Sequence, residues 1–226
     1  MILGVDACRR GWVGVVLGPA APVLVHAPGF GEVVTRAEVL GPLAAIGVDM
    51  PVGLPTSSLR EADRLARKAL GRKGSSVFTT AVREAYLAAT HAEATAVNTA
   101  RTGTGLSVQG WHLGPKVLEL DSWLRTSGRA VVEVHPELSF ARMAGAPVTA
   151  GKRTPEGAAA RRALLAGQGL WPLEDRDGTA GFAAADDLVD AAAVAWSARR
   201  YADGLATSLP SPPEVVADGV PAAIWS

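Results

Sequence analysis

Short apolar runs separated by polar turns fill the first fifty residues of the chain. The runs at 2–5, 12–17 and 23–26 are rich in Val, Leu and Ile, and the turns between them contain Gly, Arg or Pro. Runs of this kind are typical of β-strands, and short turns between them favour an antiparallel meander. A fourth run, 44–49, has the same make-up. We expect it to be the next strand, after a weakly signalled helix at 35–40.

The rest of the chain is dominated by apolar residues at helical spacing. The helices that this spacing predicts are 57–70, 82–100, 113–125, 158–166 and 184–203. One more strand is expected at Arg129–Glu137, interrupted by Pro136. A flexible basic loop is expected at 71–78, and the Pro-rich tail should pack as an irregular strand because Ile224 and Trp225 are apolar. Strands and helices in this order predict an α/β fold.

The helix expected at 184–203 begins with three acids and continues as an Ala-rich apolar run. Its apolar residues cover much of the circumference, which predicts a buried helix. Asp187 and Asp190 are three residues apart, so their Cβ atoms lie roughly 5–6 Å from each other on one face. Two interpretations stay open. Either Asp186 caps the helix and the other acids favour the positive end of its dipole, or the pair faces a divalent cation.

Two of the expected strands end in an acid. Asp6 follows the apolar residues of the first strand, and Asp49 follows those of the fourth. In α/β proteins, ligand chemistry gathers outside the carboxyl ends of the strands. An Asp at one strand end is also a common way to start a turn. Two such acids on strands of similar make-up favour a shared site.

Composition narrows the class of protein. Apolar residues make up 48% of the 226 residues, and the formal net charge is zero. We therefore expect a sizeable core and no global field that would draw the protein onto nucleic acid. Cys8 is the single cysteine, which excludes an internal disulfide and a multi-cysteine zinc site. No apolar run approaches the ~20 residues of a membrane span, and no signal peptide is visible, so the sequence predicts a soluble cytoplasmic protein.

Clustered carboxylates without Cys or His clusters favour a hard divalent cation, Mg²⁺ or Mn²⁺. Two such ions ~3.5–4 Å apart can activate a water and stabilise the leaving oxygen in phosphodiester cleavage. Asp6, Asp49, Asp187 and Asp190 are the candidate metal ligands.

Local basic and hydroxyl side chains are the candidate contacts to a phosphate backbone. The region between Arg60 and Lys73 carries six basic and two acidic residues and is the most positive part of the chain. A solvated helix face and a phosphate-contacting face both explain it. The candidate substrate-binding residues are Arg60, Arg67, Ser75, Ser76, Lys116, His135 and Lys152.

Nearly the whole chain resembles the domain-of-unknown-function family four-twenty-nine, whose members are predicted to be ribonuclease H-like nucleases. The motifs that carry the resemblance include Gly4-Val-Asp6, Gly47-Val-Asp49-Met-Pro51, Ser75-Ser-Val-Phe78, Pro115-Lys116, Glu133-Val-His135-Pro136-Glu137 and Asp186-Asp187…Asp190-Ala191. The last of these is also similar to a motif of Holliday-junction resolvases.

The resemblance implies one ribonuclease H-like domain over 1–226: a mixed five-stranded sheet flanked by helices, with a largely helical insertion at about 53–130. It implies that Asp6, Asp49, Asp187 and Asp190 bind the metal, with Glu133 as a further ligand or base. The helix-borne glutamate usual in that superfold has no clear counterpart, although Glu32 and Glu38 lie in the right region.

The expected function is therefore metal-dependent cleavage of nucleic acid or of a nucleotide-like phosphodiester. Two alternatives stay open. A phosphotransferase of the same superfold is disfavoured because 7–11 is bulky and charged where such enzymes carry Gly and Thr. A non-catalytic domain that binds nucleic acid or a small molecule is the other. The similarity to junction enzymes also leaves open a homodimer.

Overall fold

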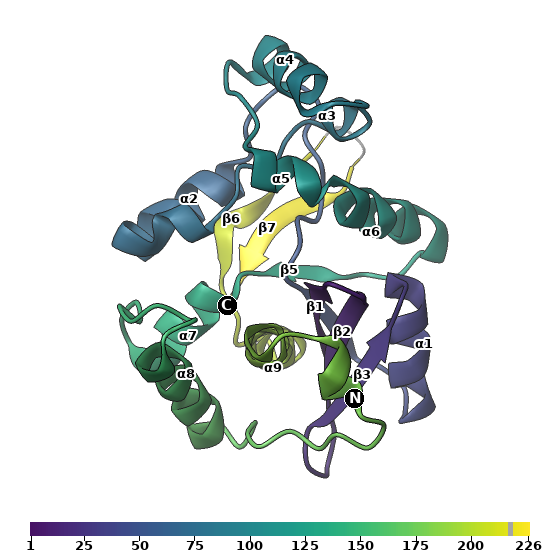
Figure 1. Cartoon of the computed structure of the whole chain (residues 1–226), viewed down its shortest axis with the longest axis vertical. Coiled ribbons are helices and arrows are strands. Elements are labelled where there is room, and N and C mark those ends of the chain that lie inside the picture. The colour runs from purple at the N-terminus through teal and green to yellow at the C-terminus, as the bar shows by residue number, and fades with distance from the viewer. Residues whose placement is uncertain (217–218) are drawn as a thin grey trace. The chain divides into compact units, whose positions relative to one another are not determined.

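The computed structural model describes residues 1–216 and 219–226, and the chain forms two compact units (Figure 1). Unit 1 contains residues 1–50, 130–207 and 225–226, and unit 2 contains residues 51–129 and 208–224. Each unit is described by itself.

Five strands form the sheet of unit 1. They are β1 (Ile2–Cys8), β2 (Gly11–Leu17), β3 (Val23–Ala27), β4 (Ala45–Val48) and β5 (Val132–Val134), in the order β3-β2-β1-β4-β5. The first three pair antiparallel, β4 is parallel to β1, and β5 is parallel to β4. The expected opening meander and fourth strand are therefore confirmed.

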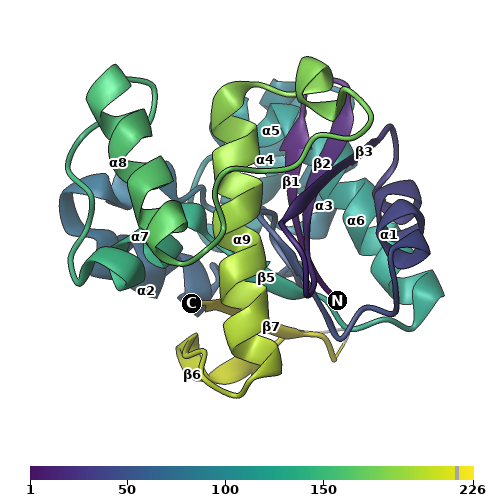
Figure 2. The ribbon, with the colours of Figure 1, turned by 90° about the horizontal axis from the view of Figure 1, so that it is seen from below.

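Helices cover both faces of this sheet (Figures 1 and 2). Helix α1 (Phe30–Val39) packs on the face formed by β2 and β3, and the long α9 (Ala185–Ala202) packs on the opposite face across β1, β2 and β4. Helices α7 (Pro136–Ala144) and α8 (Pro155–Gly167) lie against the outer side of α9. Residues 189–198 of α9 are all buried, as its apolar circumference predicts.

Glycine lets α9 approach the sheet at backbone distance. A Cβ on Gly4 of β1 would lie 2.0 Å from the backbone nitrogen of Ala195, and a Cβ on Gly47 of β4 would lie 3.0 Å from side-chain atoms of Val194 and Ala198. A side chain at position 4 is therefore incompatible with this packing. The small residues on both partners fix how close the helix lies to the strands.

Unit 2 is mainly helical. It contains α2 (Glu61–Leu70), the 3₁₀ helix η1 (Gly71–Ser76), α3 (Arg83–Tyr86), α4 (His91–Thr102), α5 (Val108–His112), α6 (Gly114–Ser127), β6 (Ser208–Val215) and most of β7 (Pro221–Trp225). Buried polar groups tie these elements together: Asp63 accepts a 2.7 Å hydrogen bond from the Thr80 backbone N–H, and Asn98 accepts one from Val82.

Several sequence-based expectations were wrong in detail. The described residues contain seven strands and not five, because the Pro-rich tail forms two strands of its own, β6 and β7. The helix expected at 82–100 is interrupted after Tyr86, and α4 begins anew at the Thr90 cap. The strand expected at 129–137 ends at Val134, because Pro136 opens helix α7.

The boundaries of other elements shift for local reasons. Helix α1 begins at Phe30, five residues before the expected start, and α2 begins only at Glu61. The expected flexible loop at 71–78 is largely the 3₁₀ helix η1. None of the helices in the described residues has the length and apolarity that crossing a bilayer requires. The architecture is a mixed α/β arrangement.

Candidate functional site

Three carboxylates from distant parts of the sequence meet in unit 1. Asp6 lies on β1, Asp49 directly follows β4, and Asp190 lies in the second turn of α9. One carboxylate oxygen from each lies within 4.8 Å of the other two. Asp6 and Asp190 are buried, with exposed fractions of 8% and 3%, and Asp49 is half-buried. We call Asp6, Asp49 and Asp190 the acidic triad.

Strand register brings the first two acids together. Gly4 of β1 is paired with Gly47 of β4, and the Asp49 backbone N–H donates a 2.9 Å hydrogen bond to the Val5 carbonyl. Side chains two residues apart on a strand share a face. Asp6 therefore points to the same face as Gly4, which is the face that α9 covers. Asp49 reaches the same place from the end of the neighbouring strand.

The helix contributes the third acid by its own periodicity. Asp190 precedes Val194 by four residues and therefore lies above it on one helix face. Val194 packs at Gly47, and Ala195 packs at Gly4. The face that contacts the two glycines thus carries Asp190 toward the carboxyl ends of β1 and β4. The acidic triad follows from two Gly-x-Asp strand ends and a helix that rests on the glycines.

Burial and mutual repulsion disfavour the charged form of these acids. Burial raises the pKa of Asp6 well above its usual range, and the charges of Asp49, Asp190 and Asp187 raise it further. Burial, followed by the charge of Asp190, also raises the pKa of Asp49. Burial raises the pKa of Asp190 to about 6, even though Lys152 acts in the opposite direction. Concentrated, desolvated negative charge of this kind is stabilised by a cation.

Lys152 supplies one positive charge to the triad. Its Nζ donates a 2.6 Å hydrogen bond to Oδ2 of Asp190 and lies 3.6 Å from Oδ2 of Asp186. Burial alone would lower the pKa of the ammonium, but the charges of Asp190, Asp186 and Asp6 outweigh it and raise the pKa. Lys152 was expected to contact substrate, and the structure brings it directly onto a triad carboxylate.

Asp187, an expected metal ligand, makes a different contact. Its Oδ2 accepts a 2.9 Å hydrogen bond from the Ala184 backbone N–H at the start of α9. The capping contact is therefore made by Asp187 and not by Asp186, which one of the two open interpretations made the cap; Asp186 pairs with Lys152 and Arg153 instead. Burial raises the pKa of Asp187. Its charge acts on Asp6, so it lies beside the acidic triad without being one of its members.

Glu133 is the middle residue of β5, and His135 directly follows the strand. Val132 and Val134 pack with Val194 of α9, so the alternation of the strand directs Glu133 to the other face of the sheet. Glu133 is buried at 6% exposure, and its charge raises the pKa of Asp49. His135 is half-buried and forms the N-cap position of α7. Glu133 is therefore linked electrostatically to the triad through Asp49, whereas His135 marks the start of α7.

A buried ion pair joins α7 and α8 next to the site. Nη2 of Arg161 on α8 donates hydrogen bonds of 2.6 and 2.8 Å to the two carboxylate oxygens of Glu137 on α7. Arg161 also lies over the ring of Phe140, 5.5 Å from its centroid. The charge of Glu137 contributes to the raised pKa of Asp190. No sequence signal pairs two residues 24 positions apart, and the pair was not anticipated.

A pocket of about 240 Å³ adjoins the acidic triad within unit 1. Its wall includes Asp190 and Asp186 of α9 together with four basic side chains. The basic residues are Lys152, Arg153, Arg161 and Arg162. The wall of the pocket therefore combines Asp190 of the triad with a cluster of positively charged side chains.

The other candidate substrate contacts lie in unit 2, where most of them make contacts within the unit. Arg60 is buried 3.5 Å from Asp63, and Arg67 donates hydrogen bonds to the Val77 carbonyl and to Thr79. The remaining three candidates lie in or near η1 and on α6. Ser75 is exposed, Ser76 donates a 2.8 Å hydrogen bond to the Lys73 carbonyl, and Lys116 lies 3.4 Å from Glu119.

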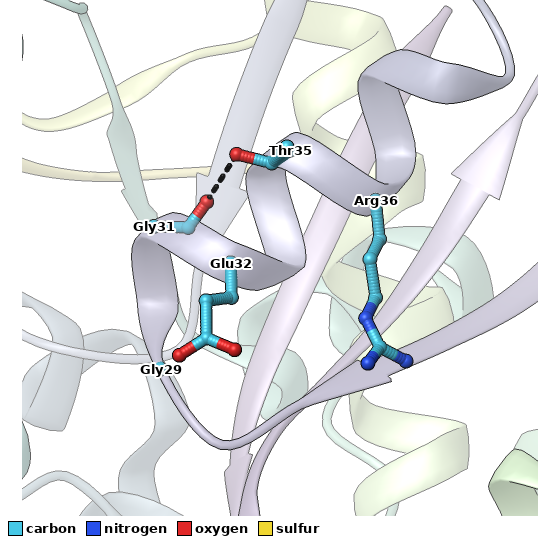
Figure 3. Close-up of a pocket in the computed structure, with 5 residues that line it drawn as sticks. All are labelled: Gly29, Gly31, Glu32, Thr35 and Arg36. Atoms are coloured by element: carbon cyan, nitrogen blue, oxygen red, sulfur yellow. Dashed lines mark hydrogen bonds between the residues drawn. The ribbon is translucent and has the colours of Figure 1, made fainter.

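Glu32 lies in the first turn of α1, where it lines a surface pocket with Thr35 and Arg36 (Figure 3). In that view the side chains of Glu32 and Arg36 extend from the helix on the same side, and Thr35 donates to the Gly31 carbonyl. Within residues 1–216 and 219–226, the group of potential metal ligands contains neither Glu32 nor Glu38. Neither glutamate therefore takes the place of the helix-borne glutamate that the resemblance led us to look for.

A family model described as "Protein of unknown function (DUF429)" matches residues 4–215 of the chain. That range includes the acidic triad, Lys152 and most of both units. No curated protein and no solved structure matches the chain.

Proposed function

The chain belongs to the family of unknown function DUF429, and on that premise we propose that it is a metal-dependent nuclease with the acidic triad as its catalytic centre. The observation that carries this proposal is the convergence of Asp6, Asp49 and Asp190 within 4.8 Å of one another. Three carboxylates that are largely desolvated cost free energy unless a cation offsets their repulsion.

The donor set fits a hard divalent cation. Each member of the triad offers carboxylate oxygen, which Mg²⁺ and Mn²⁺ prefer. Asp6, Asp49 and Asp190 would hold such a cation, which would supply a water of lowered pKa and stabilise a leaving oxygen. Asp187 holds the first turn of α9 in place, so that Asp190 on the following turn keeps its position over the strand ends.

The arrangement of the elements supports the ribonuclease H-like fold that the motifs imply. Asp6 lies on the first strand of an antiparallel meander, and an acid follows the fourth strand, which is parallel to the first. An Asp-x-x-Asp segment begins a late helix that packs on the same face. Because function cannot be read from fold alone, the proposal rests on the chemistry of the triad.

The reaction proposed is hydrolysis of a phosphodiester. A P–O bond forms to the water oxygen and the P–O bond to the departing sugar oxygen breaks. The water gives up a proton to the surroundings, and the sugar oxygen takes one up and leaves as a hydroxyl group. The basic side chains of the pocket beside Asp190 would hold the phosphate that is cleaved or its neighbour. Glu133 adds negative charge near Asp49 from the other face of the sheet and is proposed as an accessory acid.

Cleavage of a labelled panel of single strands, duplexes, a hybrid and a junction with Mn²⁺ tests this proposal. Asp6→Asn and Asp190→Asn should each lower cleavage by more than roughly 100-fold, because even partners outside the ligand set of metal sites cost about 10–100-fold. Asp203→Asn, at the exposed other end of α9, is the matched control and should cleave normally. Cleavage that survives both triad substitutions would refute the proposal.

A further inference from the structure

The ammonium of Lys152 contacts the Asp190 carboxylate oxygen that a bound metal ion would also use. It donates to Oδ2 of Asp190 at 2.6 Å, and the Asp190 side chain is nearly closed to solvent at 4% exposure. A charged hydrogen bond of this length to a buried carboxylate is among the stronger polar contacts in proteins. A divalent cation that uses this oxygen must therefore compete with Lys152.

We propose that Lys152 is a built-in counter-ion that a divalent cation displaces from Asp190, and that the displaced ammonium converts the adjoining pocket into a phosphate-binding site. The inference rests on the proposed function, since it concerns the same acidic triad. It adds an order of events: metal binds first, and the phosphate site forms as a consequence.

The second position for the ammonium already exists. Asp186 lies 3.6 Å from the same Nζ, one turn earlier on α9. Lys152 can therefore give up Asp190 while it keeps a carboxylate partner. The side chain is 39% exposed, so part of it already faces solvent at the mouth of the pocket. The displacement needs a change of side-chain position and no movement of α9.

The charge of the pocket changes with this step. With Lys152 on Asp190, the two acids of the wall balance Lys152 and Arg153, Glu137 neutralises the buried Arg161, and Arg162 leaves an excess of one positive charge. Once the cation takes Asp190, Asp186 is the one acid of the described lining left to balance Lys152, Arg153 and Arg162. The positive excess of the side chains then rises from one charge to two, and the pocket favours an anion more strongly.

Size and donor chemistry indicate which anion fits. The volume of about 240 Å³ is below the ~300–1,000 Å³ of pockets that hold drug-sized ligands. Guanidinium and ammonium groups are the usual partners of phosphate oxygens. The pocket therefore suits a single phosphate group, either the one next to the scissile bond or the terminal phosphate of a product.

The first test compares the Mn²⁺ affinities of two variants that each remove one positive charge. Lys152→Met removes the ammonium on Asp190 and should tighten Mn²⁺ binding by roughly tenfold or more, measured by calorimetry. Arg153→Met is the matched control, because Arg153 contacts Asp186 and not Asp190. It should change the affinity much less. Equal effects of the two variants would reduce the result to general electrostatics and overturn the displacement.

Lys152→Arg is a second variant that keeps the test decisive if Lys152→Met fails to fold. It keeps a cation within reach of Asp190 and should bind Mn²⁺ no more tightly than wild type. Circular dichroism of both variants accompanies the titrations. Tighter binding by Lys152→Arg than by wild type would contradict the competition.

The second test measures binding of inorganic phosphate with and without saturating Mg²⁺. Wild type should bind phosphate at least about tenfold more tightly with Mg²⁺, and Lys152→Met should lose most of that gain. A gain that Lys152→Met retains in full would overturn the inference, because phosphate would then be held by the metal alone. If wild-type protein binds no divalent cation, the proposed function fails. If it does bind and Lys152→Met binds equally well, the inference alone fails.

Discussion

At the scale of single residues, the site sets buried negative charge against the ammonium of Lys152. Asp190 illustrates it: burial raises its pKa to about 6, although the Lys152 ammonium is only 2.6 Å away. Sequence alone identified this acid and its neighbours on the strand ends. It could not show that Lys152 would meet Asp190, because that contact joins a loop and a helix 38 residues apart, and no local pattern reports it.

The raised pKa of Asp190 predicts a pH dependence of stability. An unfolded Asp has a pKa of about 3.9, so the fold binds the proton more tightly than the unfolded chain does. This contribution is fully present below pH ~4 and is lost as the pH rises through about 6. It amounts to a loss on the order of 2–3 kcal/mol. Asp190→Asn, which cannot ionise, should therefore gain stability relative to wild type across that range.

Urea unfolding in the presence of a chelator, at several pH values between 4 and 7, measures the effect. Asp203→Asn is the control and should follow wild type. If the stabilities of Asp190→Asn and wild type change in parallel with pH, the carboxyl titrates at its ordinary pKa, and the electrostatic description of the triad is incorrect.

The buried pair of Arg161 and Glu137 predicts a large loss of stability when one partner is removed. Glu137→Ala leaves a guanidinium that is 1% exposed without its carboxylate. Removal of one partner from such a pair typically costs about 3–5 kcal/mol. Glu61→Ala, which breaks an exposed ion pair with Arg64, should cause little change. Equal midpoints of urea unfolding for the two variants would contradict this prediction.

At the scale of elements, the packing of α9 on two glycines positions the site. The apolar circumference of this helix predicted it from the sequence, and the apolar runs that end in Asp predicted the strand ends. The sequence misled where a helix begins next to a proline. His135-Pro136 was interpreted as an interrupted strand, whereas Pro is well suited to the first turn of a helix and opens α7.

The break between α3 and α4 had a local signal that the Ala-rich pattern outweighed. Thr90 and Glu93 form reciprocal hydrogen bonds of 3.2 Å in a capping box. The Thr-x-x-Glu spacing that starts a helix was present in the sequence within the run at 82–100. Because apolar residues recur at helical spacing on both sides of the break, the sequence was interpreted as one continuous helix.

The contact at Gly4 yields a prediction that separates packing from chemistry. Gly4→Ala places a methyl group 2.0 Å from the Ala195 backbone nitrogen, so α9 must move away from β1. Overpacking of this kind costs about 1–3 kcal/mol, and the displaced Asp190 should weaken Mn²⁺ binding although no ligand is changed. Gly14→Ala is the matched control, since its Cβ would meet the ends of the Leu3 and Val25 side chains instead.

Urea unfolding and Mn²⁺ titration of both variants provide the measurement. The prediction fails if Gly4→Ala retains wild-type Mn²⁺ affinity, or if Gly14→Ala weakens it to the same extent.

At the scale of the whole molecule, every member of the triad comes from unit 1, and the chain enters unit 2 directly after Met50, one residue beyond Asp49. The helical character of much of 51–129 could be predicted from apolar spacing. The association of 208–224 with those helices could not, because the tail carries no periodic pattern and its strands depend on partners far away in sequence.

Because all three triad residues belong to unit 1, metal binding should protect backbone amides of unit 1 from hydrogen exchange. Added Mg²⁺ should slow amide hydrogen exchange at the carboxyl ends of β1 and β4 and in the first turns of α9, because binding stabilises the native contacts there. Exchange within 51–129 should change little. Asp6→Asn should abolish the protection. Protection of comparable size throughout 51–129 would argue against a site formed by unit 1.

The Gly-x-Asp spacing at both strand ends has a consequence for how this protein tolerates change. The glycine sets where the helix rests, and the acid lies two positions later on the same face. The residue between them, Val5 or Val48, points to the opposite face of the sheet and is fully buried there, so it contributes apolar packing and no group to the triad. Positions 5 and 48 should therefore accept several β-branched residues in an evolving lineage, whereas an insertion or deletion of one residue would turn the carboxylate to the opposite face of the sheet. The number of residues between each glycine and its acid therefore decides whether the triad can form.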